Sequence, residues 1–579
     1  MHHRHRFNHL VAAVLFQLFV AATVSALPRY GPLEVAGNLS AQNEIRNSDI
    51  DHLSLVQQRN TFKLRVDYDM LDRGRLIERF DIPFIEKTKL FLLYRGVYDS
   101  VYDLKPGFEQ TDIYGRKIND PVYAKFPPFP GFSKFYPENN LDTLKGAEGL
   151  RFENQLREAY FDVKLKTLPL SFRLGRQQIV WGETDNFRML DRVNALNLTW
   201  HLQQESWDEL RIPYWMIKGL WTIDQLGPLS SAFVEAYWNP GDWSPAKRAF
   251  LPRPWSAPIL NPLNSAMGLT GIHRLYHDTK LSLQGDYSRD PGDNSQVGVR
   301  FSAVSPQGVQ FTLNYFYQRW AGDDGTNAAS IAGITGKAEG NSAIVNGQLP
   351  IVVVAPYIHT IGVSLNYADE EYTQAVFRAE TIYEMGVPFN DYSKPLLCDR
   401  PQCTPLKGDV FGISKHDMWK GMLAFDRPTW IRPLNRKSTF LILGQFFWHY
   451  LLDNPELNPS THQGLRGEFS SSSYGVPPFT AKPIYDRVRD WEVLTTLAAT
   501  TFYQGGKIVP LVVYILDPVN KYNMEVTWMV DYFLTNNLIL NLSQRYFINT
   551  TSAPVYESWG LGGINRGRSE TGLRLTYQF

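Results

Sequence analysis

The chain ends in the sequence Glu570-Thr-Gly-Leu-Arg-Leu-Thr-Tyr-Gln-Phe579, and this stretch decides the fold class. Counted back from the terminus, every second residue is apolar or aromatic: Phe579, Tyr577, Leu575 and Leu573. The residues between them are polar or small. Because successive side chains of a β-strand point to opposite faces, this alternation predicts a strand with one apolar face and one polar face.

The same alternation recurs through most of the chain. Apolar or aromatic residues occupy every second position in several further segments, and charged or polar residues mostly stand between them. Examples are 62–70, 159–165, 297–303, 309–317 and 524–532. Alternation alone does not separate a soluble β-sandwich, whose apolar face is its interior, from a membrane barrel, whose apolar face is its exterior.

The connectors between the strands distinguish the two architectures. Strands are predicted at 33–46, 54–70, 86–103, 155–166, 169–181, 210–224, 230–240, 295–304, 308–320, 356–367, 372–384, 416–427, 438–451, 490–503, 507–516, 522–534, 538–548 and 569–579. Short connectors such as 167–169 and 305–308 alternate with long ones such as 104–154 and 452–489. Short turns at one end and long loops at the other are typical of outer-membrane barrels, and an even strand number returns both termini to the periplasm.

The sequence therefore predicts an all-β protein, a single antiparallel transmembrane β-barrel of about 18 strands, within roughly 16 to 20, over residues 27–579. Two regions fit this scheme poorly. The 71–85 connector is long for the periplasmic end, and residues 268–288 have the pattern of a further strand that the scheme leaves in a loop. The terminal Phe, with a Tyr two residues before it, also resembles the closing-strand signal of Gram-negative outer-membrane barrels, which implies an outer-membrane location.

Residues 1–26 have the features of a secretory signal peptide. A basic start precedes an apolar core at 10–20, and Val24-Ser25-Ala26 fits the small-residue cleavage rule. The alternative is a single membrane anchor, but the apolar run is too short for one and lacks a flanking stop signal. No later stretch has 18 consecutive apolar residues, which excludes a helical membrane protein.

The composition narrows the function further. The chain has 58 basic and 58 acidic residues, and loss of Arg4 and Arg6 with the signal leaves 56 against 58, a formal charge of −2. A nucleic-acid binder needs a clear basic excess, so no such partner is expected. The two cysteines, Cys398 and Cys403, are expected to form one disulfide that pins a loop. We predict no cofactor and no metal site, because a two-cysteine site lacks nearby histidines.

Residues 175–200 form the most distinctive stretch of the chain. The predicted strand before it is followed by opposed charges: Glu183, Asp185, Arg188, Asp191 and Arg192. Phe187, Leu190 and Val193 stand at helical spacing. Because this loop is too apolar to lie free in water, we expect 182–209 to fold into the lumen as a constriction of the pore. The alternative is an outer cap that packs on other loops.

Two motifs here, Gly175-Arg176-Gln177 and Trp181-Gly182-Glu183, resemble those of a family of proteobacterial outer-membrane proteins of unknown function. The likeness continues through 209–213, 233–238 and 243–245. Members are often associated with exporters of the resistance-nodulation-division type and with an outer-membrane lipoprotein. The resemblance implies an outer-membrane β-barrel and a partner of that kind. It implies no substrate and no catalytic residues.

The polar faces of the predicted strands carry charges of both signs. The predicted pore-lining residues are Lys63, Arg65, Asp67, Glu158, Asp162, Arg173, Arg300, Arg378, Glu380, Arg545 and Arg574. Neither sign dominates, so a dedicated anion pore is not expected, and most of these residues are expected to form salt bridges within the wall. The basic, Pro-rich stretch 243–255 either pairs with the acids of the first loop or forms an ordered surface loop.

These features predict a channel or transporter for small, amphipathic or hydrophobic compounds in the outer membrane of a Gram-negative bacterium, with membrane lipid around it. The alternative is an outer-membrane scaffold that docks a periplasmic lipoprotein or exporter and passes hydrophobic cargo. An enzyme such as a lipase is not predicted, because the sequence has no His-Glu-x-x-His and no Gly-x-Ser-x-Gly. Oligomeric state and direction of transport are left open.

Overall fold

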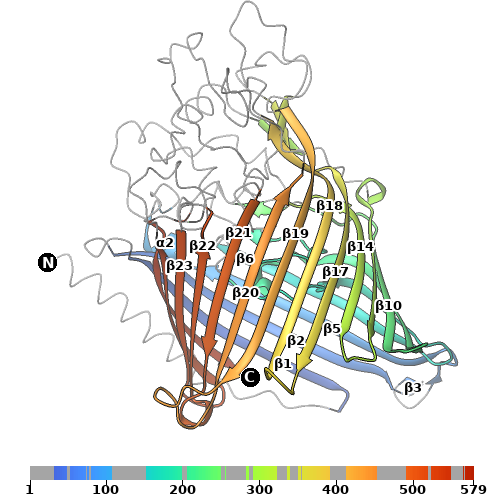
Figure 1. Ribbon diagram of the computed structural model, residues 1–579, viewed down its shortest axis with the longest axis horizontal. Helices are drawn as coiled ribbons and strands as arrows, with labels where there is room; N and C mark the ends of the chain where they lie inside the picture. The colour runs from blue at the N-terminus through green and yellow to red at the C-terminus, as the bar shows by residue number, and fades with distance from the viewer. Residues whose placement is uncertain are drawn as a thin grey trace, which may run out of the picture.

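The computed structural model describes residues 31–47, 53–72, 75–76, 80–106, 108, 151–198, 205–244, 246–248, 255, 282–285, 291–322, 336–338, 350–353, 355–391, 412–452, 491–519, 523–548, 565 and 567–579. One sheet of 20 strands dominates them. Two of its strands, β3 (Arg75–Leu76) and β4 (Phe80–Asp81), form a small ladder inside one connection, and the other 18 form the wall of a barrel (Figure 1). The predicted signal peptide and both cysteines lie outside the described residues.

The wall strands follow one another around the barrel in chain order. They are β1 (Leu33–Arg46), β2 (Ser54–Asp72), β5 (Ile85–Asp99), β6 (Phe152–Leu165), β7 (Leu170–Gln177), β9 (Tyr214–Leu226), β10 (Leu229–Asn239), β13 (Gln296–Val304), β14 (Gln310–Arg319), β17 (Tyr357–Asp369), β18 (Ala375–Asp391), β19 (Gly412–Thr429), β20 (Phe440–Leu451), β21 (Trp491–Thr500), β22 (Ile508–Asp517), β23 (Asn523–Phe533), β24 (Leu538–Ile548) and β25 (Glu570–Gln578).

The barrel is closed by antiparallel pairing of its first and last wall strands, β1 and β25. At the end of that seam, Gly37 N–H donates to the Phe579 carbonyl at 2.9 Å and Phe579 N–H donates to the Gly37 carbonyl at 3.0 Å. Closure leaves no strand edge whose N–H and C=O groups would face hydrocarbon without partners. The predicted fold, a closed antiparallel barrel of about 18 strands, is confirmed.

Connections at the two ends differ as predicted. The start of β1, the end of β25 and the short turns share one end of the barrel, with turns for example at 166–169, 227–228 and 534–537. The exception at that end is the connection from β2 to β5, which carries the β3–β4 ladder. Within 268–288, the described strand is β12 (Ser282–Gly285); it lies outside the wall in a three-stranded sheet with β16 (Pro350–Val353) and β15 (Gly336–Ala338).

Side chains on the outer face of the wall are apolar and exposed. Leu313, Ile361 and Leu423 are each about half exposed, at 50%, 51% and 55%, whereas Thr312 and Thr360 on the alternate positions are buried. So much exposed apolar surface is unfavourable in water but matches the lipid-facing band of a membrane barrel. The few described helices are short: α2 (Val101–Leu104), α5 (Trp207–Leu210), η5 (Pro291–Asn294) and η8 (Gln504–Gly506). Within the described part of the chain, no helix has the length and apolar character needed to span a membrane.

Candidate functional site: a segment that crosses the lumen

Residues 178–213 connect β7 to β9, and we call them the lumen segment. Its described residues bond to strands on opposite sides of the barrel: Gln42 of β1, Lys63 of β2, Glu158 of β6, Glu235 of β10, Glu380 of β18 and Thr496 of β21. A single segment can contact strands all around a closed wall only if it lies inside the barrel. The chain therefore leaves the wall after β7, crosses the bore and returns at β9.

The local sequence explains where the chain leaves the wall. Gly175 has a φ of +138°, and a Cβ there would lie 2.2 Å from the Ala159 carbonyl oxygen, so only glycine fits. Two residues later, Gln177 is the last residue of β7 and stands directly opposite Tyr214, the first residue of β9. The lumen segment thus enters and leaves the bore at neighbouring points on the wall.

The side chain of Asn194 ties the two ends of the lumen segment together. Its Oδ1 accepts a hydrogen bond from Ile179 N–H at 2.9 Å, and its Nδ2 donates to the Ile212 carbonyl at 2.8 Å. Asn194 is fully buried. A buried amide with both of its functions bonded to backbone groups fixes the path of the chain on both sides.

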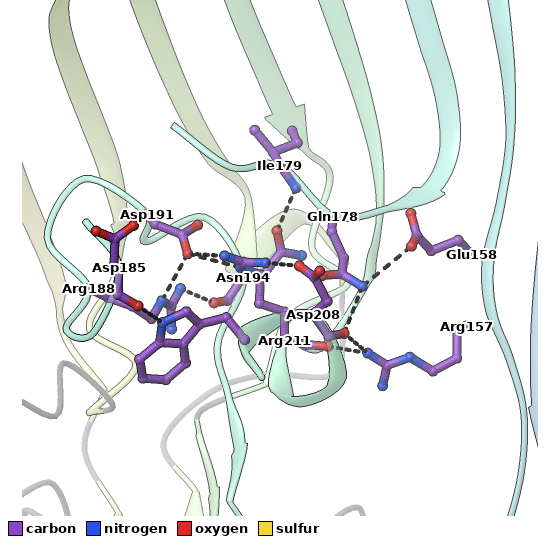
Figure 2. A network of polar contacts seen from close by, with 11 residues as sticks. Arg157, Glu158, Gln178, Ile179, Asp185, Arg188, Asp191, Asn194, Asp208 and Arg211 are labelled. Atoms are coloured by element: carbon purple, nitrogen blue, oxygen red, sulfur yellow. Dashed lines mark hydrogen bonds and ion pairs between the residues drawn. The ribbon is translucent and has the colours of Figure 1, made fainter. Parts of the chain in front are cut away.

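A network of charged groups lies inside the lumen segment (Figure 2). The Arg211 guanidinium donates to the carboxylates of Asp191 and Asp208, each at 2.6 Å. Asp191 also pairs with Arg188 at 3.3 Å, and Arg157 of β6 donates to the Arg211 carbonyl at 2.8 Å. The predicted opposed charges of this loop therefore neutralise one another in part.

The Trp181-Gly182-Glu183 motif anchors the lumen segment to the wall. The Trp181 indole N–H donates to Glu235 of β10 at 2.8 Å, and the side chain is 1% exposed. A Cβ on Gly182 would lie 2.9 Å from the backbone nitrogen of Asp191, so the chain packs closely on itself here. The backbone N–H of Glu183 donates to the Glu380 carboxylate.

Charged residues of β18, four strands further along the wall from β10, hold the same segment. The Glu380 carboxylate also accepts the N–H of Leu190 at 3.2 Å. Arg378 pairs with Asp185 at 2.7 Å and with Asp426 of β19 at 2.8 Å. These contacts place two predicted pore-lining residues, Arg378 and Glu380, against the predicted constriction residues Glu183 and Asp185.

A third anchor on β18 is a buried ion pair that the sequence reasoning missed. Glu384 pairs with Lys420 of β19 at 2.7 Å and with Arg192 of the lumen segment. The side chains of Glu384 and Lys420 are 0% and 2% exposed. Glu384 stands in step with the predicted inward positions Arg378 and Glu380, so the alternation was the signal that could have identified it. No inward position was predicted on the strand of Lys420.

The remaining predicted pore-lining residues form pairs along the inner face. Arg65 pairs with Asp67 at 2.5 Å, Arg173 with Asp162 at 2.7 Å, Arg300 with Glu235 at 3.2 Å and Arg545 with Glu525 at 3.1 Å. Lys63 pairs with Glu209 of the lumen segment, Gln178 donates to Glu158 at 3.4 Å, and Arg574 lines the open cavity described below. The structure thus brings some of these residues to the lumen segment and leaves others in wall ladders.

The inner face is not hydrophilic throughout, and this corrects the expectation of a polar bore. Apolar residues of the lumen segment, among them Phe187, Met189, Leu190 and Val193, form one buried core with wall residues Phe316, Ile382, Met422, Phe447, Leu494 and Ile515. The rings of Phe187 and Phe447 meet edge to face at 5.2 Å. Along this arc the inner face is mixed: apolar side chains pack on the apolar residues of the lumen segment, and charged ones such as Glu380 and Glu384 bond to it. Although Phe187, Leu190 and Val193 stand at helical spacing, no helix forms over 179–195.

An open cavity of about 630 Å³ remains beside the lumen segment. One side is formed by Asp185–Phe187 and Glu205–Asp208, and the other by the inner faces of β22, β23, β24, β25 and β1. In the basic stretch 243–255, strand β11 (Lys247–Arg248) pairs in parallel with β8 (Asn197–Leu198) of the lumen segment. Among the described residues, no group of three or more acidic, His or Cys side chains is arranged to hold a metal ion.

The fold and this internal segment define a class: a closed antiparallel transmembrane β-barrel whose lumen is crossed by one connecting segment. Residues 46–579 match the family described as "Protein of unknown function (DUF1302)", and the chain belongs to that family. The predicted membership of a family without assigned function is confirmed. The outer-membrane location of that family and its exporter and lipoprotein partners stay predictions. No curated protein matches the chain.

Several solved structures match most of the chain at low sequence identity. They include Salmonella typhi OmpF in complex with daunomycin (7% identity, 96% of this chain and 100% of that chain, TM-score 0.36) and Pseudomonas aeruginosa OccK2 (OpdF) in complex with glucuronate (7%, 96% and 99%, 0.39). Acinetobacter baumannii OccAB4 is a third (8%, 94% and 97%, 0.39). At these identities and scores, nothing follows about what this chain carries.

Proposed function

We propose that this protein is a channel in the outer membrane of a Gram-negative bacterium that passes small amphipathic or hydrophobic compounds, with the lumen segment setting its aperture. The observation that carries the proposal is the cavity of about 630 Å³ that stays open between the lumen segment and the wall. A barrel of this size has more interior than its wall side chains fill, so its bore holds water or a plug. Residues 1–26 are proposed to direct export of the chain.

The asymmetry of the bore supports this function over that of a sealed barrel. The apolar core packs the lumen segment against one arc of the wall, from Phe316 on β14 to Ile515 on β22. The adjoining arc, β23 to β1, keeps polar side chains such as Thr527, Asn541 and Arg574 facing the cavity. Polar side chains that faced a dry interior without partners would be energetically costly, so these side chains favour water in the cavity. A channel needs such a hydrated route.

Deletion of the lumen segment tests the proposal. Because Gln177 and Tyr214 stand directly opposite each other, replacing 179–212 with a short turn converts β7 and β9 into a simple hairpin. We expect single-channel conductance in planar bilayers to rise severalfold, since the wider bore then carries the current. Tyr372→Ala, in an exposed turn between β17 and β18, is the control and should leave conductance unchanged. A deletion variant that inserts and folds but conducts no better than the parent would contradict the role given to the lumen segment.

A second candidate function is docking of a periplasmic lipoprotein or exporter. It is favoured by the β2–β5 connection, where β3 and β4 extend one turn at the end of the barrel that carries the chain ends (Figure 1). A photo-cross-linking residue in place of Leu76 should then give one adduct of defined mass in cells. The same residue in place of Tyr372 is the control. Absence of an adduct specific to the Leu76 position counts against docking at this hairpin.

A further inference from the structure

The open cavity beside the lumen segment has two chemically different walls. Its volume of about 630 Å³ falls within the roughly 300–1,000 Å³ of small-molecule sites. Strand register assigns each wall: successive inward positions of β22 stand opposite those of β23, then β24, then β25 and β1. The side chains change from apolar to polar and acidic along this path, and this change determines which ligands the cavity can hold.

One wall is apolar. Leu511, Val513 and Ile515 are consecutive inward residues of β22, and Met529 of β23 stands opposite Leu511. Phe187 of the lumen segment faces the same cavity. These side chains form a continuous surface on which an apolar body displaces water favourably.

The facing wall is polar and acidic. β25 and β1 present Glu570, Arg574, Gln42 and Glu44. β25 lies three strands and β1 four strands away from β22, which is about 14 and about 19 Å along the wall. The Gln42 amide donates to Glu44 at 3.0 Å and to Glu205 of the lumen segment at 2.8 Å, so carboxylates from the wall and from the segment meet at one point.

The balance of charge around the cavity is negative. Six carboxylates line it, from Glu44, Asp185, Glu205, Asp208, Glu525 and Glu570. Three guanidinium groups oppose them, from Arg211, Arg545 and Arg574, which leaves a formal charge of 3 − 6 = −3. Three ion pairs reach outside this lining: Arg211 is shared with Asp191, Asp185 pairs with Arg378, and Glu570 pairs with Arg46. Counting these three partners as well leaves a formal charge of −3 − 1 + 2 = −2 among the described residues. A lumen with low-dielectric walls focuses such a field and raises the local concentration of cations.

We infer that this cavity binds amphipathic organic cations, with the apolar body on the β22 surface and the positive group toward Glu44 and Glu205. The inference rests on the proposed function and specifies its cargo class. An anion of the same shape would meet the same apolar wall but an unfavourable field. The sign of the charge therefore distinguishes ligands that have the same shape and hydrophobicity.

Tetraphenylphosphonium and tetraphenylborate test this directly, because they have nearly the same shape and opposite charge. Equilibrium dialysis of the folded, detergent-solubilised protein against each ion, with protein-free micelles as the blank, should show saturable binding of the phosphonium and at least roughly tenfold weaker binding of the borate. Glu44→Gln combined with Glu205→Gln should weaken phosphonium binding by roughly tenfold per charge removed. Val513→Thr, which keeps the side-chain shape, should weaken it less.

Glu86→Gln, an acid outside the cavity lining and paired with Lys164, is the matched control and should bind as the parent does. Equal binding of the two ions, or full phosphonium binding by the Glu44/Glu205 double variant, would overturn the inference. The dialysis measures binding without current, so its result is separable from the bilayer experiment. If deletion of the lumen segment raises conductance but the parent protein binds the two ions equally, the proposed channel function stands and the inferred cargo class is wrong.

Discussion

The indole N–H of Trp181 donates a hydrogen bond of 2.8 Å to the carboxylate of Glu235, so the lumen segment is fastened to β10 through a buried polar contact. The indole ring also packs on Tyr237 and Phe316, with centroid distances of 5.4 and 5.1 Å. Glu235 has two further partners, Arg300 at 3.2 Å and Lys218 at 3.4 Å. The indole ring is thus held by packing as well as by its hydrogen bond, and the Glu235 carboxylate keeps two cationic partners without it.

Trp181→Ala should therefore loosen the lumen segment without opening the wall. Loss of a buried Trp side chain costs about 3–5 kcal/mol, and here that cost falls mainly on the contact between segment and wall. Trp181→Phe should cost about 1 kcal/mol, because Glu235 keeps its cationic partners. Limited proteolysis of the folded barrel, with cleavage mapped to 178–213, measures the difference. Trp430→Ala, at a Trp that is 53% exposed, is the control; equal protection in Trp181→Ala and the parent would show that the indole is no anchor.

Lys420→Met should destabilise the barrel more than its conservative shape suggests. It leaves the buried Glu384 carboxylate with Arg192 alone, and breaking a buried ion pair costs about 3–5 kcal/mol. The double variant Glu384→Gln/Lys420→Met removes the carboxylate that has lost one of its two cations and should recover part of that loss. Recovery should be incomplete, because Arg192, whose side chain is 10% exposed, then loses its acidic partner. Urea unfolding in lipid vesicles gives the free energies of unfolding.

The matched control for that cycle is Lys164→Met, which breaks an exposed pair with Glu86 and should cost no more than about 1 kcal/mol. If both lysine variants were equally stable, the buried pair would contribute no more than the exposed one. The comparison holds the chemical change constant and varies only burial.

Gly421→Ala should be destabilising, whereas Gly219→Ala should be neutral. An added Cβ at Gly421 would lie 1.9 Å from the Trp448 ring, which covers this glycine from the next strand, so the indole must move. Such overpacking costs about 1–3 kcal/mol. At Gly219 the nearest atom would be Phe172 at 3.5 Å, an ordinary contact, and the change should stay within about 0.5 kcal/mol. Thermal unfolding followed by gel mobility ranks the two; the reverse order would refute this assignment of the aromatic cover.

The wall was predictable because its signal is local. The alternation at 522–534 predicts β23 almost to the residue, since strand period and lipid exposure act on each position independently. The strand predicted at 169–181 is too long, because β7 ends at Gln177. Ile179 and Trp181 continue the apolar pattern, but they bury against the lumen segment's own core and not against lipid.

The interior was less predictable because it depends on register between distant strands. Alternation places Glu384 and Lys420 on the inner face, but their pairing follows from how β18 and β19 align, which no single strand encodes. The apolar side of the bore did leave a signal, the uninterrupted run of β22 from Ile508 to Ile515. A strand apolar on both faces needs something other than water inside, and the lumen segment supplies it.

Asn186 and Thr496 provide a way to ask whether the lumen segment must move for transport. The Asn186 amide donates to the Thr496 hydroxyl of β21 at 3.1 Å, so two short side chains already meet between segment and wall. Asn186→Cys with Thr496→Cys, in a background with Cys398→Ser and Cys403→Ser, should form a disulfide at this point, because side chains in contact bring the Cβ atoms near bonding range. If transport requires displacement of the segment, oxidation should lower conductance severalfold and a reductant should restore it, since the covalent bond removes only the displaced states. Each single cysteine variant controls for the substitutions themselves. Conductance that is the same in oxidised and reduced protein would mean that ions pass through the fixed cavity between Phe187 and β22–β25, with the lumen segment acting as a static constriction.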